Sequence, residues 1–385
     1  MQTVKTAQQN YRSTVEILDL FDVFRSMVNY CVHVGLSENV TSLKSMSLRA
    51  YRDLGSFGAM SYYRLAAISA AVGILRNYRK ASRKGQRPTF PCARKLGLTT
   101  CYGFRISNGN LFLPVKPSMH VTIPLTKHTL ETISGYEVRS VTLTPSKLSI
   151  AFAKYVVEVT PQGFIGIDRN LNDVTVATAC DEIQQIDLTK LAEIRSMYLN
   201  IRSKFRRNDA RIRRGMNHKY GVKERAKVQQ ILHHTSSLIV NKAKKKQYGV
   251  VMEKLTGIRR LYRRRNGQGA KYRFRSNSWS YGELQRQIEY KARWEGLPVI
   301  YVHPHGTSAR CSKCGSRMIP EERRIVRCAA CGLTIDRDVN AARNILARGV
   351  RFAPVGPPSE AMVQEPKRKV ILKVDGGQLA CTSAS

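Results

Sequence analysis

The chain has 385 residues, and 65 lysines and arginines against 27 acidic residues give it a formal net charge of +38. Its 42% of hydrophobic residues can fill the cores of two or three domains, which excludes a wholly disordered basic protein. Such an excess of positive charge indicates a polyanionic partner. No apolar run approaches the roughly 20 residues that a membrane-spanning helix requires.

The first 160 residues combine a helical part with a β-rich part. Residues 1–10 are polar and form either a frayed start or a first strand of the β-rich part. Apolar residues recur every three or four positions across 11–90, which predicts a helical region. Apolar and polar residues alternate across 91–160 around Asn-Gly and Pro-Ser turns, which predicts an antiparallel β module.

The segment 161–305 mixes both periodicities and is expected to be an α/β domain. A strand with the sequence FIGIDRN begins a hairpin, and a long basic helical stretch occupies about 190–246. The buried strand YGVVMEKL, a helix over 279–295 and the strand LPVIYVHP follow. After a cysteine-rich insert, one more helix completes this domain, and the tail 351–385 with its prolines is expected to be disordered.

Four cysteines of the insert at 306–335 are spaced C-x2-C-x13-C-x2-C, and a glycine follows the second cysteine of each pair. They are Cys311, Cys314, Cys328 and Cys331. Four thiolates on two tight turns suit a tetrahedral Zn²⁺ ion in a closed structural site, because no coordination position is left for a substrate. Since the N-terminal sequence lacks the apolar core of a signal peptide, we expect metal ligation in a reducing compartment and not disulfides.

Three acidic residues lie at the ends of predicted elements. Asp168 ends the strand FIGIDRN, Glu253 ends the strand YGVVME, and Asp338 begins the helix 336–350. Taken singly, each has a simpler interpretation as a turn residue, an exposed strand end or a helix cap, and Asp336 is an alternative cap. Taken together in a basic chain, they predict a site for two Mg²⁺ ions about 4 Å apart that acts on nucleic-acid phosphate, with Asp168 bridging both ions.

The chain resembles the TnpB family of transposon-encoded RNA-guided nucleases, which are related to type V CRISPR effectors. The resemblance rests on GIDRN, VVMEKL, HGTSARCSKCG, CGLTIDRDVNAARNIL and NYRKASRKGQRPTFP, and it is strongest from about 163 to 348. It implies an RNase H-like (RuvC) α/β core with an inserted zinc ribbon, preceded by a β-barrel-like module with a helical recognition insert. It also implies a catalytic triad of Asp168, Glu253 and Asp338, because the family pattern places the last acid two residues before Asn340.

The same resemblance implies a function. The protein would read a short motif in double-stranded DNA and cleave the adjacent DNA that is complementary to a guide RNA, by metal-dependent hydrolysis. The guide would derive from a transposon end, one protein copy would act per guide RNA, and the complex would work in a prokaryotic cytoplasm at the nucleoid. Two alternatives stay open: an RNA-guided DNA-binding regulator that does not cut, and a structure-specific nuclease that consists of protein alone. The intact triad favours cleavage.

Two basic segments lie within the α/β domain and are predicted to contact nucleic acid. The segment 194–227 carries 12 lysines and arginines against two acids, and 258–275 carries eight and no acid, with aromatic residues between them. Arginine beside aromatic residues suits backbone contact and base stacking, and in the resembling family the second segment is a lid over the active site. In the helical region, Arg76 and Asn77 could contact base edges. The full set of candidates is Arg76, Asn77, Arg79, Lys80, Arg202, Arg206, Arg207, Arg213, Arg263, Arg264 and Arg265.

Overall fold

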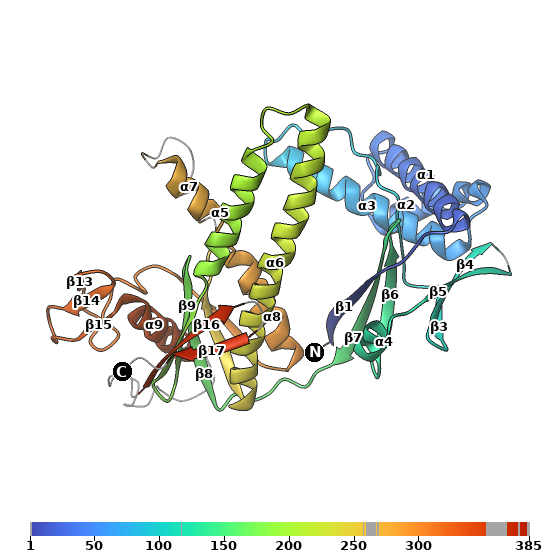
Figure 1. Cartoon of the computed structure of the whole chain (residues 1–385). Coiled ribbons are helices and arrows are strands. Elements are labelled where there is room, and N and C mark those ends of the chain that lie inside the picture. The colour runs from blue at the N-terminus through green and yellow to red at the C-terminus, as the bar shows by residue number, and fades with distance from the viewer. Residues whose placement is uncertain are drawn as a thin grey trace. The chain divides into compact units, whose positions relative to one another are not determined.

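The computed structural model describes residues 2–116, 118–256, 258, 267 and 269–351, together with the backbone of 368–375 and 378–382. The chain divides into two compact units, residues 2–155 and 156–385, and each is described separately (Figure 1). No helix within the described ranges has both the length and the apolar character that crossing a bilayer requires.

Helices form residues 15–83 of unit 2–155, apart from short connections. The two long helices α1 and α3 pack against each other and bury apolar side chains at helical spacing, among them Phe21 and Phe24 of α1 and Ile68 and Leu75 of α3. The Tyr63 hydroxyl of α3 is buried and donates a hydrogen bond of 2.6 Å to a carbonyl of the following β-rich part. The helices are α1 (Val15–Ser37), α2 (Leu43–Ala50), the 3-10 helix η1 (Asp53–Phe57) and α3 (Ser61–Arg83).

Two antiparallel sheets form the β-rich part of this unit. The first has the order β1-β7-β6-β2 and the second the order β3-β4-β5, and the helix α4 (Lys127–Ile133) follows the second sheet in the chain. The strands are β1 (Gln2–Asn10), β2 (Leu98–Thr100), β3 (Arg105–Ser107), β4 (Asn110–Lys116), β5 (Met119–Pro124), β6 (Glu137–Leu143) and β7 (Lys147–Tyr155). The first residues therefore form a strand, one of the two outcomes expected from the sequence. Closure of these sheets into a barrel-like module stays a prediction.

A seven-stranded sheet with the order β12-β11-β8-β9-β10-β16-β17 organises unit 156–385. The strand β9 runs antiparallel to the central strand β8, whereas β11 runs parallel to β8 and β12 parallel to β11. The β8–β11 register places Ile167 opposite Met252. The strands are β8 (Gly163–Arg169), β9 (Asp173–Thr178), β10 (Glu182–Asp187), β11 (Tyr248–Glu253), β12 (Val299–Val302), β16 (Arg368–Asp375) and β17 (Gln378–Thr382).

Helices cover both faces of this sheet (Figure 1). Ile167 and Met252 point to one face, where they pack into a core with α5 (Thr189–Ser203), α6 (Ala210–Lys245) and α8 (Tyr281–Trp294). Phe164 and Val251 point to the other face, where they pack against α9 (Arg337–Arg351). The short helix α7 (Ala270–Asn277) precedes α8 in the chain. Because side chains alternate along a strand, Asp168 and Glu253 share the α9 face with Phe164 and Val251.

The helix α9 lies close to the sheet because two glycines leave room for it. A Cβ atom on Gly166 of β8 would lie 2.3 Å from the carbonyl oxygen of Ala342 and 2.6 Å from the Cβ of Leu346. A Cβ atom on Gly349 of α9 would lie 2.4 Å from the side chain of Val251. The first turn of α9 therefore reaches the ends of β8 and β11, where the first two acids are found.

The cysteine-rich insert is a small antiparallel sheet with the order β13-β14-β15 between β12 and α9. Its strands are β13 (Met318–Pro320), β14 (Ile325–Cys328) and β15 (Thr334–Asp336). Met318, Val326 and Ile335 are buried together with Ala177 of β9 and Val339 of α9. The insert therefore shares a hydrophobic core with the large sheet.

The tail 351–385 differs from the expected disorder, because it contains β16 and β17. The strand β16 pairs in parallel with β10, and β17 pairs antiparallel with β16, so the tail extends the large sheet at its open edge. The prolines that suggested disorder all precede residue 367, and the sequence RKVILKV that follows is rich in β-branched and alternating apolar residues. The prediction rested on the composition of the whole tail and did not consider this short strand pattern at its end.

Candidate functional site

The three predicted acids occupy the ends of three elements on the same side of the large sheet. Asp168 is the penultimate residue of β8, Glu253 is the last residue of the neighbouring parallel strand β11, and Asp338 is the second residue of α9. All three carboxyl groups are buried, and their residues are no more than 8% exposed. Buried carboxylates that gather at one edge of a sheet are costly unless a cation or hydrogen bonds compensate them.

Asp336 and Asp338 have different environments, which separates the two candidates for the third acid. The carboxylate of Asp336 accepts hydrogen bonds from the backbone N–H groups of Asp338 and Val339, at 2.9 and 3.2 Å. Asp336 therefore caps α9, as a helix-start aspartate commonly does. Asp338 is the buried acid that interacts electrostatically with Asp168.

Burial raises the pKa of two of these acids, and the other acids of the site add to this change at Asp168. Burial, together with the negative charges of Glu253 and Asp338, raises the pKa of Asp168 to about 7. Burial also raises the pKa of Glu253, although the Thr307 hydroxyl and the positive charge of Arg169 oppose this change. The site therefore carries more negative charge than its protein surroundings neutralise, and a bound divalent cation would relieve this excess.

Each acid also has a polar partner within the protein. The side-chain amide of Asn170 donates to Asp168 at 3.0 Å, and the Thr307 hydroxyl donates to Glu253 at 2.5 Å. The three carboxylates do not form a compact ligand cage. Among the histidine, cysteine, aspartate and glutamate side chains of the described residues, only the four cysteines form a group of three or more whose ligand atoms all lie within 4.8 Å of one another.

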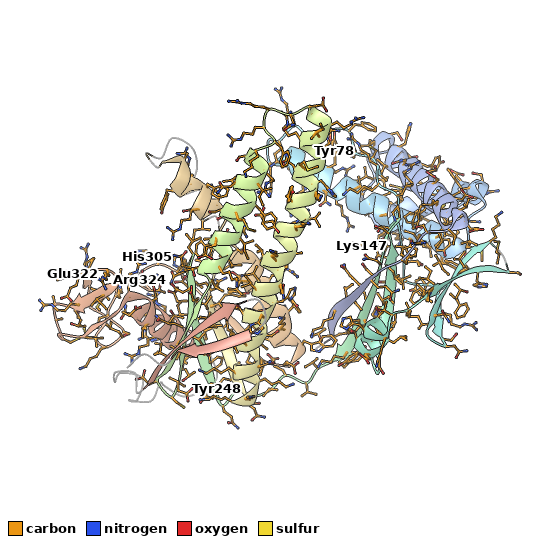
Figure 2. The ribbon with its side chains drawn as sticks, viewed as in Figure 1. Tyr78, Lys147, Tyr248, His305, Glu322 and Arg324 are labelled. Atoms are coloured by element: carbon orange, nitrogen blue, oxygen red, sulfur yellow. The ribbon has the colours of Figure 1, made fainter. Side chains whose placement is uncertain are left out.

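Arg324 links the cysteine-rich insert to the acidic site. It lies between β13 and β14, forms an ion pair with Asp338, and forms a second ion pair of 2.9 Å with Asp173 of β9. Figure 2 labels Arg324 on the side of the insert nearer the large sheet, and Glu322 on the far side. The guanidinium of Arg324, which belongs to the insert, therefore neutralises part of the negative charge of Asp338.

Arg169 holds the strand end that carries the first two acids. It is buried, and its guanidinium donates to the backbone carbonyl of Glu253 at 2.6 Å, to the carbonyl of Tyr281 at 3.2 Å and to the side chain of Gln285 at 2.8 Å. One side chain thus joins the ends of β8 and β11 to the start of α8. Because it contacts the backbone of Glu253 and not its carboxylate, its role is to position that acid.

The four predicted cysteines converge at one point of the insert. Sγ of Cys311 lies 3.7 Å from Sγ of Cys331, and Sγ of Cys314 lies 3.4 Å from Sγ of Cys328. These distances exclude disulfides, whose sulfur atoms are ~2.05 Å apart. They agree with the spacing of roughly 3.8 Å between sulfur atoms bound at ~2.3 Å to a tetrahedral ion. The residues after the second cysteine of each pair, Gly315 and Gly332, have φ of 78° and 72°, as a tight turn around an ion requires.

The helix α9 connects the cysteine cluster to the acids through polar side chains on one face. Asn340 donates to the Arg310 carbonyl at 2.7 Å and accepts from the backbone N–H of Ser312 at 2.8 Å. Asn344, one turn later, donates to the Thr307 and Arg310 carbonyls, each at 2.7 Å. Arg348, one further turn along, donates to the carbonyls of the segment that contains His305, which Figure 2 labels.

The predicted nucleic-acid contacts are only partly exposed. Arg206, Arg207 and Arg213 are exposed near the turn between α5 and α6, whereas Arg202 is half-buried and paired with Glu224. On α3, Asn77 and Lys80 are exposed, but the Arg76 and Arg79 side chains donate to Thr41 at 3.1 and 3.0 Å. The candidates that fall outside the described residues are Arg263, Arg264 and Arg265.

Sequence reasoning missed several residues that shape the site. Arg169 stands within GIDRN and Thr307 within HGTSARC, so both lie inside segments that were recognised as informative. Arg324 lies in the charged run EERR, where nothing distinguishes it from a solvent-exposed side chain. Only the antiparallel pairing of β13, β14 and β15 brings it to Asp338.

Parts of the chain are similar in sequence to known proteins. The family model described as Cas12f1-like, TNB domain, matches residues 281–345. The TnpB-like protein MJ0751 of Methanocaldococcus jannaschii is 29% identical over 238 residues, which cover 60% of this chain and 84% of that protein. The CRISPR-associated endodeoxyribonuclease Cas12f1 of Sulfoacidibacillus thermotolerans is 42% identical over 118 residues, which cover 29% of this chain and 25% of that protein.

A shorter match and a solved structure complete the comparison. The putative RNA-guided DNA endonuclease InsQ of Escherichia coli is 44% identical over 71 residues, which cover 17% of each chain. The chain thus spans only a quarter or less of the length of Cas12f1 and InsQ in these alignments. A Cas12f1 structure solved with sgRNA and target DNA shares the fold, with a TM-score of 0.61, 16% identity, and coverage of 86% of this chain and 83% of that chain. In sequence, the chain is thus similar to TnpB-like proteins and to Cas12f nucleases, and it has a mixed α/β fold and a four-cysteine insert beside α9.

Proposed function

We propose that the protein is a transposon-encoded, RNA-guided DNA endonuclease. The observation that carries the proposal is the convergence of Asp168, Glu253 and Asp338, all buried, at one edge of the sheet in a chain of net charge +38. A cluster of acids repels nucleic acid on its own, so the basic surroundings and bound cations are both needed to bring phosphate to it.

The arrangement of β8–β12 supports an RNase H-like (RuvC) core. A central first strand is flanked by an antiparallel hairpin on one side and by two parallel strands on the other, which is the arrangement of RNase H-like nucleases. In this assignment the core covers 161–305 and 336–350, and the insert 306–335 is a zinc ribbon. The helical region and the β module of residues 1–160 would hold the guide RNA and read the flanking DNA motif.

The residues of both sites fit the expected metals. Carboxylates are the ligands that Mg²⁺ prefers, and the raised pKa of Asp168 indicates uncompensated negative charge at the site. When bound there, Mg²⁺ would activate water and stabilise the leaving 3′-oxygen. Asp168, Glu253 and Asp338 would hold the ions, Arg169 and Thr307 would orient Glu253, and the four thiolates of the insert would hold Zn²⁺.

Partners follow from the names of the relatives. InsQ is described as a putative RNA-guided DNA endonuclease, and the Cas12f1 structure contains sgRNA and target DNA. We extend this to the present chain as a guide RNA and a double-stranded target with a short flanking motif, one protein copy per guide. Specificity would then come from base pairing, and the protein would contribute backbone contacts through residues such as Arg206, Arg207 and Arg213.

A cleavage assay on the full chain with its co-purified RNA tests the function and the site together. Target DNA should be cut in Mg²⁺ and left intact in EDTA. Asp168→Ala, Glu253→Ala or Asp338→Asn should lower the rate by on the order of 1,000-fold or more, because each removes several kcal/mol of transition-state stabilisation.

The matched control is Asp336→Asn, since asparagine caps a helix as well as aspartate does. This variant should cut at nearly the rate of the wild type. Binding of guide and target without any cutting would favour the non-cleaving regulator, and cutting without RNA would favour a nuclease of protein alone. Equal rates for wild type and Asp168→Ala would reject the site.

A further inference from the structure

A cavity lies between α5, α6 and the start of α8, on the face of the large sheet opposite α9. Its volume is about 300 Å³, at the lower end of the roughly 300–1,000 Å³ typical of small-ligand pockets. A smaller cavity of about 20 Å³ shares the walls formed by Arg195, Trp279 and Tyr281, and it is also lined by Asn170 and Leu171. Asn170 connects this cavity to the first acid, because its side-chain amide donates a hydrogen bond of 3.0 Å to Asp168.

Two aromatic rings form one wall of this cavity. Trp279 and Tyr281 lie with ring centroids 5.0 Å apart and planes inclined by 53°. Trp279 is only half-buried between α7 and α8, whereas Trp294, the other tryptophan of the chain, is 5% exposed in the core. A half-buried tryptophan at a cavity wall offers a ring face on which a planar ligand can stack.

Positive charge surrounds the same wall. Arg195 of α5 donates to the hydroxyl of Ser280, which keeps a guanidinium at the cavity. The two acids that line the cavity, Glu224 and Glu283, are already paired, with Arg202 and Arg286 respectively. Arg225, which also lines the cavity, forms no ion pair with another described residue. The cavity therefore favours an anionic ligand that carries a flat, stackable group.

We propose that this cavity binds one unpaired nucleotide of the DNA strand that enters the acidic site, with its base stacked on Trp279 and its phosphate near Arg225. This inference rests on the proposed function, because it takes the strand cut at Asp168 as the occupant. Base stacking on an aromatic ring and charge contacts to the backbone are the two ways in which proteins hold single strands without reading their sequence. A nucleotide held here would fix the position of its neighbour at the acids.

Trp279 fluorescence provides a test that does not depend on cleavage. In a Trp294→Phe background, Trp279 is the one tryptophan left, and a buffer without added Mg²⁺ prevents cutting by the full chain with its co-purified RNA and contains no chelator that would act on the cysteine cluster. A short single-stranded DNA should quench this fluorescence, and the same oligonucleotide with abasic positions should not. Trp279→Leu should weaken binding of the labelled DNA about 5- to 150-fold, because stacking contributes ~1–3 kcal/mol per base. Trp279→Phe, which keeps a ring, should retain most of the affinity, and equal melting temperatures would exclude misfolding.

The outcomes separate this inference from the proposed function. Unchanged DNA affinity in Trp279→Leu, or equal quenching by the abasic strand, would overturn the subsite. Quenching by single-stranded RNA but not by DNA would overturn the assigned ligand. If the wild type never cuts target DNA but base-dependent quenching is seen, the nuclease proposal fails and the subsite stands. If the wild type cuts and Trp279→Leu binds and cuts as well, the subsite alone fails.

Discussion

Both burial and neighbouring groups affect the ionisation of Asp168. Burial and the charges of Glu253 and Asp338 raise its pKa, and one hydrogen bond from Asn170 opposes the change. An ion bound at the site would reverse this balance, because it favours the charged form of every carboxyl group around it. The metal-free protein and the metal-loaded protein should therefore respond differently to pH.

We expect the stability of the metal-free protein to show this pKa. The pKa of this carboxyl group rises on folding from 3.8 to about 7, so the group adds most to the free energy of unfolding below pH 4. This contribution is lost as pH rises through 7, and the loss in the free energy of unfolding is on the order of 4 kcal/mol. Asp168→Asn has no such group, so in EDTA its stability advantage over the wild type should grow between pH 5 and pH 8. Urea unfolding at both pH values measures this difference, and a constant difference would contradict the electrostatic description of the site.

Single residues show what the sequence could and could not reveal. The positions of Asp168 and Glu253 at the ends of buried strands were predictable from the apolar patterns, and their catalytic role stays a prediction. The choice of Asp338 over Asp336 came from a family pattern, and its physical reason is the capping role of Asp336. Arg324 was not predictable, since its approach to Asp338 depends on a sheet formed by segments of weak strand pattern.

At the scale of elements, the packing of α9 on β8 determines whether the acids meet. The helix can approach because Gly166 has no side chain, and Asn340 and Asn344 then attach the cysteine-rich insert to the same helix. One helix thus packs on the strand that carries Asp168, contributes Asp338 itself, and holds the insert that supplies Arg324.

Gly166→Ala adds only one methyl group, but we expect it to lower both the stability of the protein and its cleavage rate. The added Cβ would overlap the Ala342 carbonyl, so α9 must shift, and we expect a loss of about 1–3 kcal/mol in the free energy of unfolding. Cleavage should fall further than stability explains, because Asp338 moves with the helix. The matched control is Gly215→Ala in α6, where nothing lies near the new atom and a gain of ~0.5–1 kcal/mol is expected. Urea unfolding and cleavage rates compare the two variants, and equal behaviour would argue against the close packing.

If the cysteine cluster holds Zn²⁺ as proposed, removal of that ion should affect one element first. Without an ion the four thiols lose their common partner, so the insert 306–335 should unfold while β8 and β11 stay protected. Hydrogen exchange measured with and without a chelator, or in Cys331→Ser, should show faster exchange in that segment. Cys180→Ser, which changes an exposed cysteine outside the cluster, should leave exchange unchanged. Uniform loss of protection across the sheet would mean that the cluster supports the whole unit.

Elements with strong periodicity were predicted well, and short or composite ones were not. The helices α1, α3 and α8 and the strands β8 and β11 lie where their apolar patterns place them, because burial on one face produces those patterns. The strands β16 and β17 were missed, because they pair with an edge far away in the sequence and follow a proline-containing segment.

At the scale of the whole molecule, the charge of +38 predicts a strong salt dependence of nucleic-acid binding. Arg206, Arg207 and Arg213 are exposed candidates for binding phosphate. Their joint replacement by glutamine should weaken binding equally for unrelated sequences. It should also reduce the slope of log K against log salt by ~0.9 for each phosphate that is no longer neutralised, and by up to about 3 in total. Binding isotherms over a salt series measure this slope, and an unchanged slope would place the nucleic acid elsewhere.

The alternation of side chains along β8 and β11 has a consequence for how the chain finds its fold. A slip of one residue in either strand would exchange an acid with an apolar neighbour and turn a carboxylate into the core formed with α5, α6 and α8. An unpaired carboxylate in that apolar core would be far less stable than the native arrangement. The residues proposed to cut DNA therefore also discriminate against misaligned sheets. Replacement of Asp168 and Glu253 by neutral residues would remove the repulsion between the acids in the native site. It would also increase the fraction of chains in which β8 or β11 pairs in the wrong register.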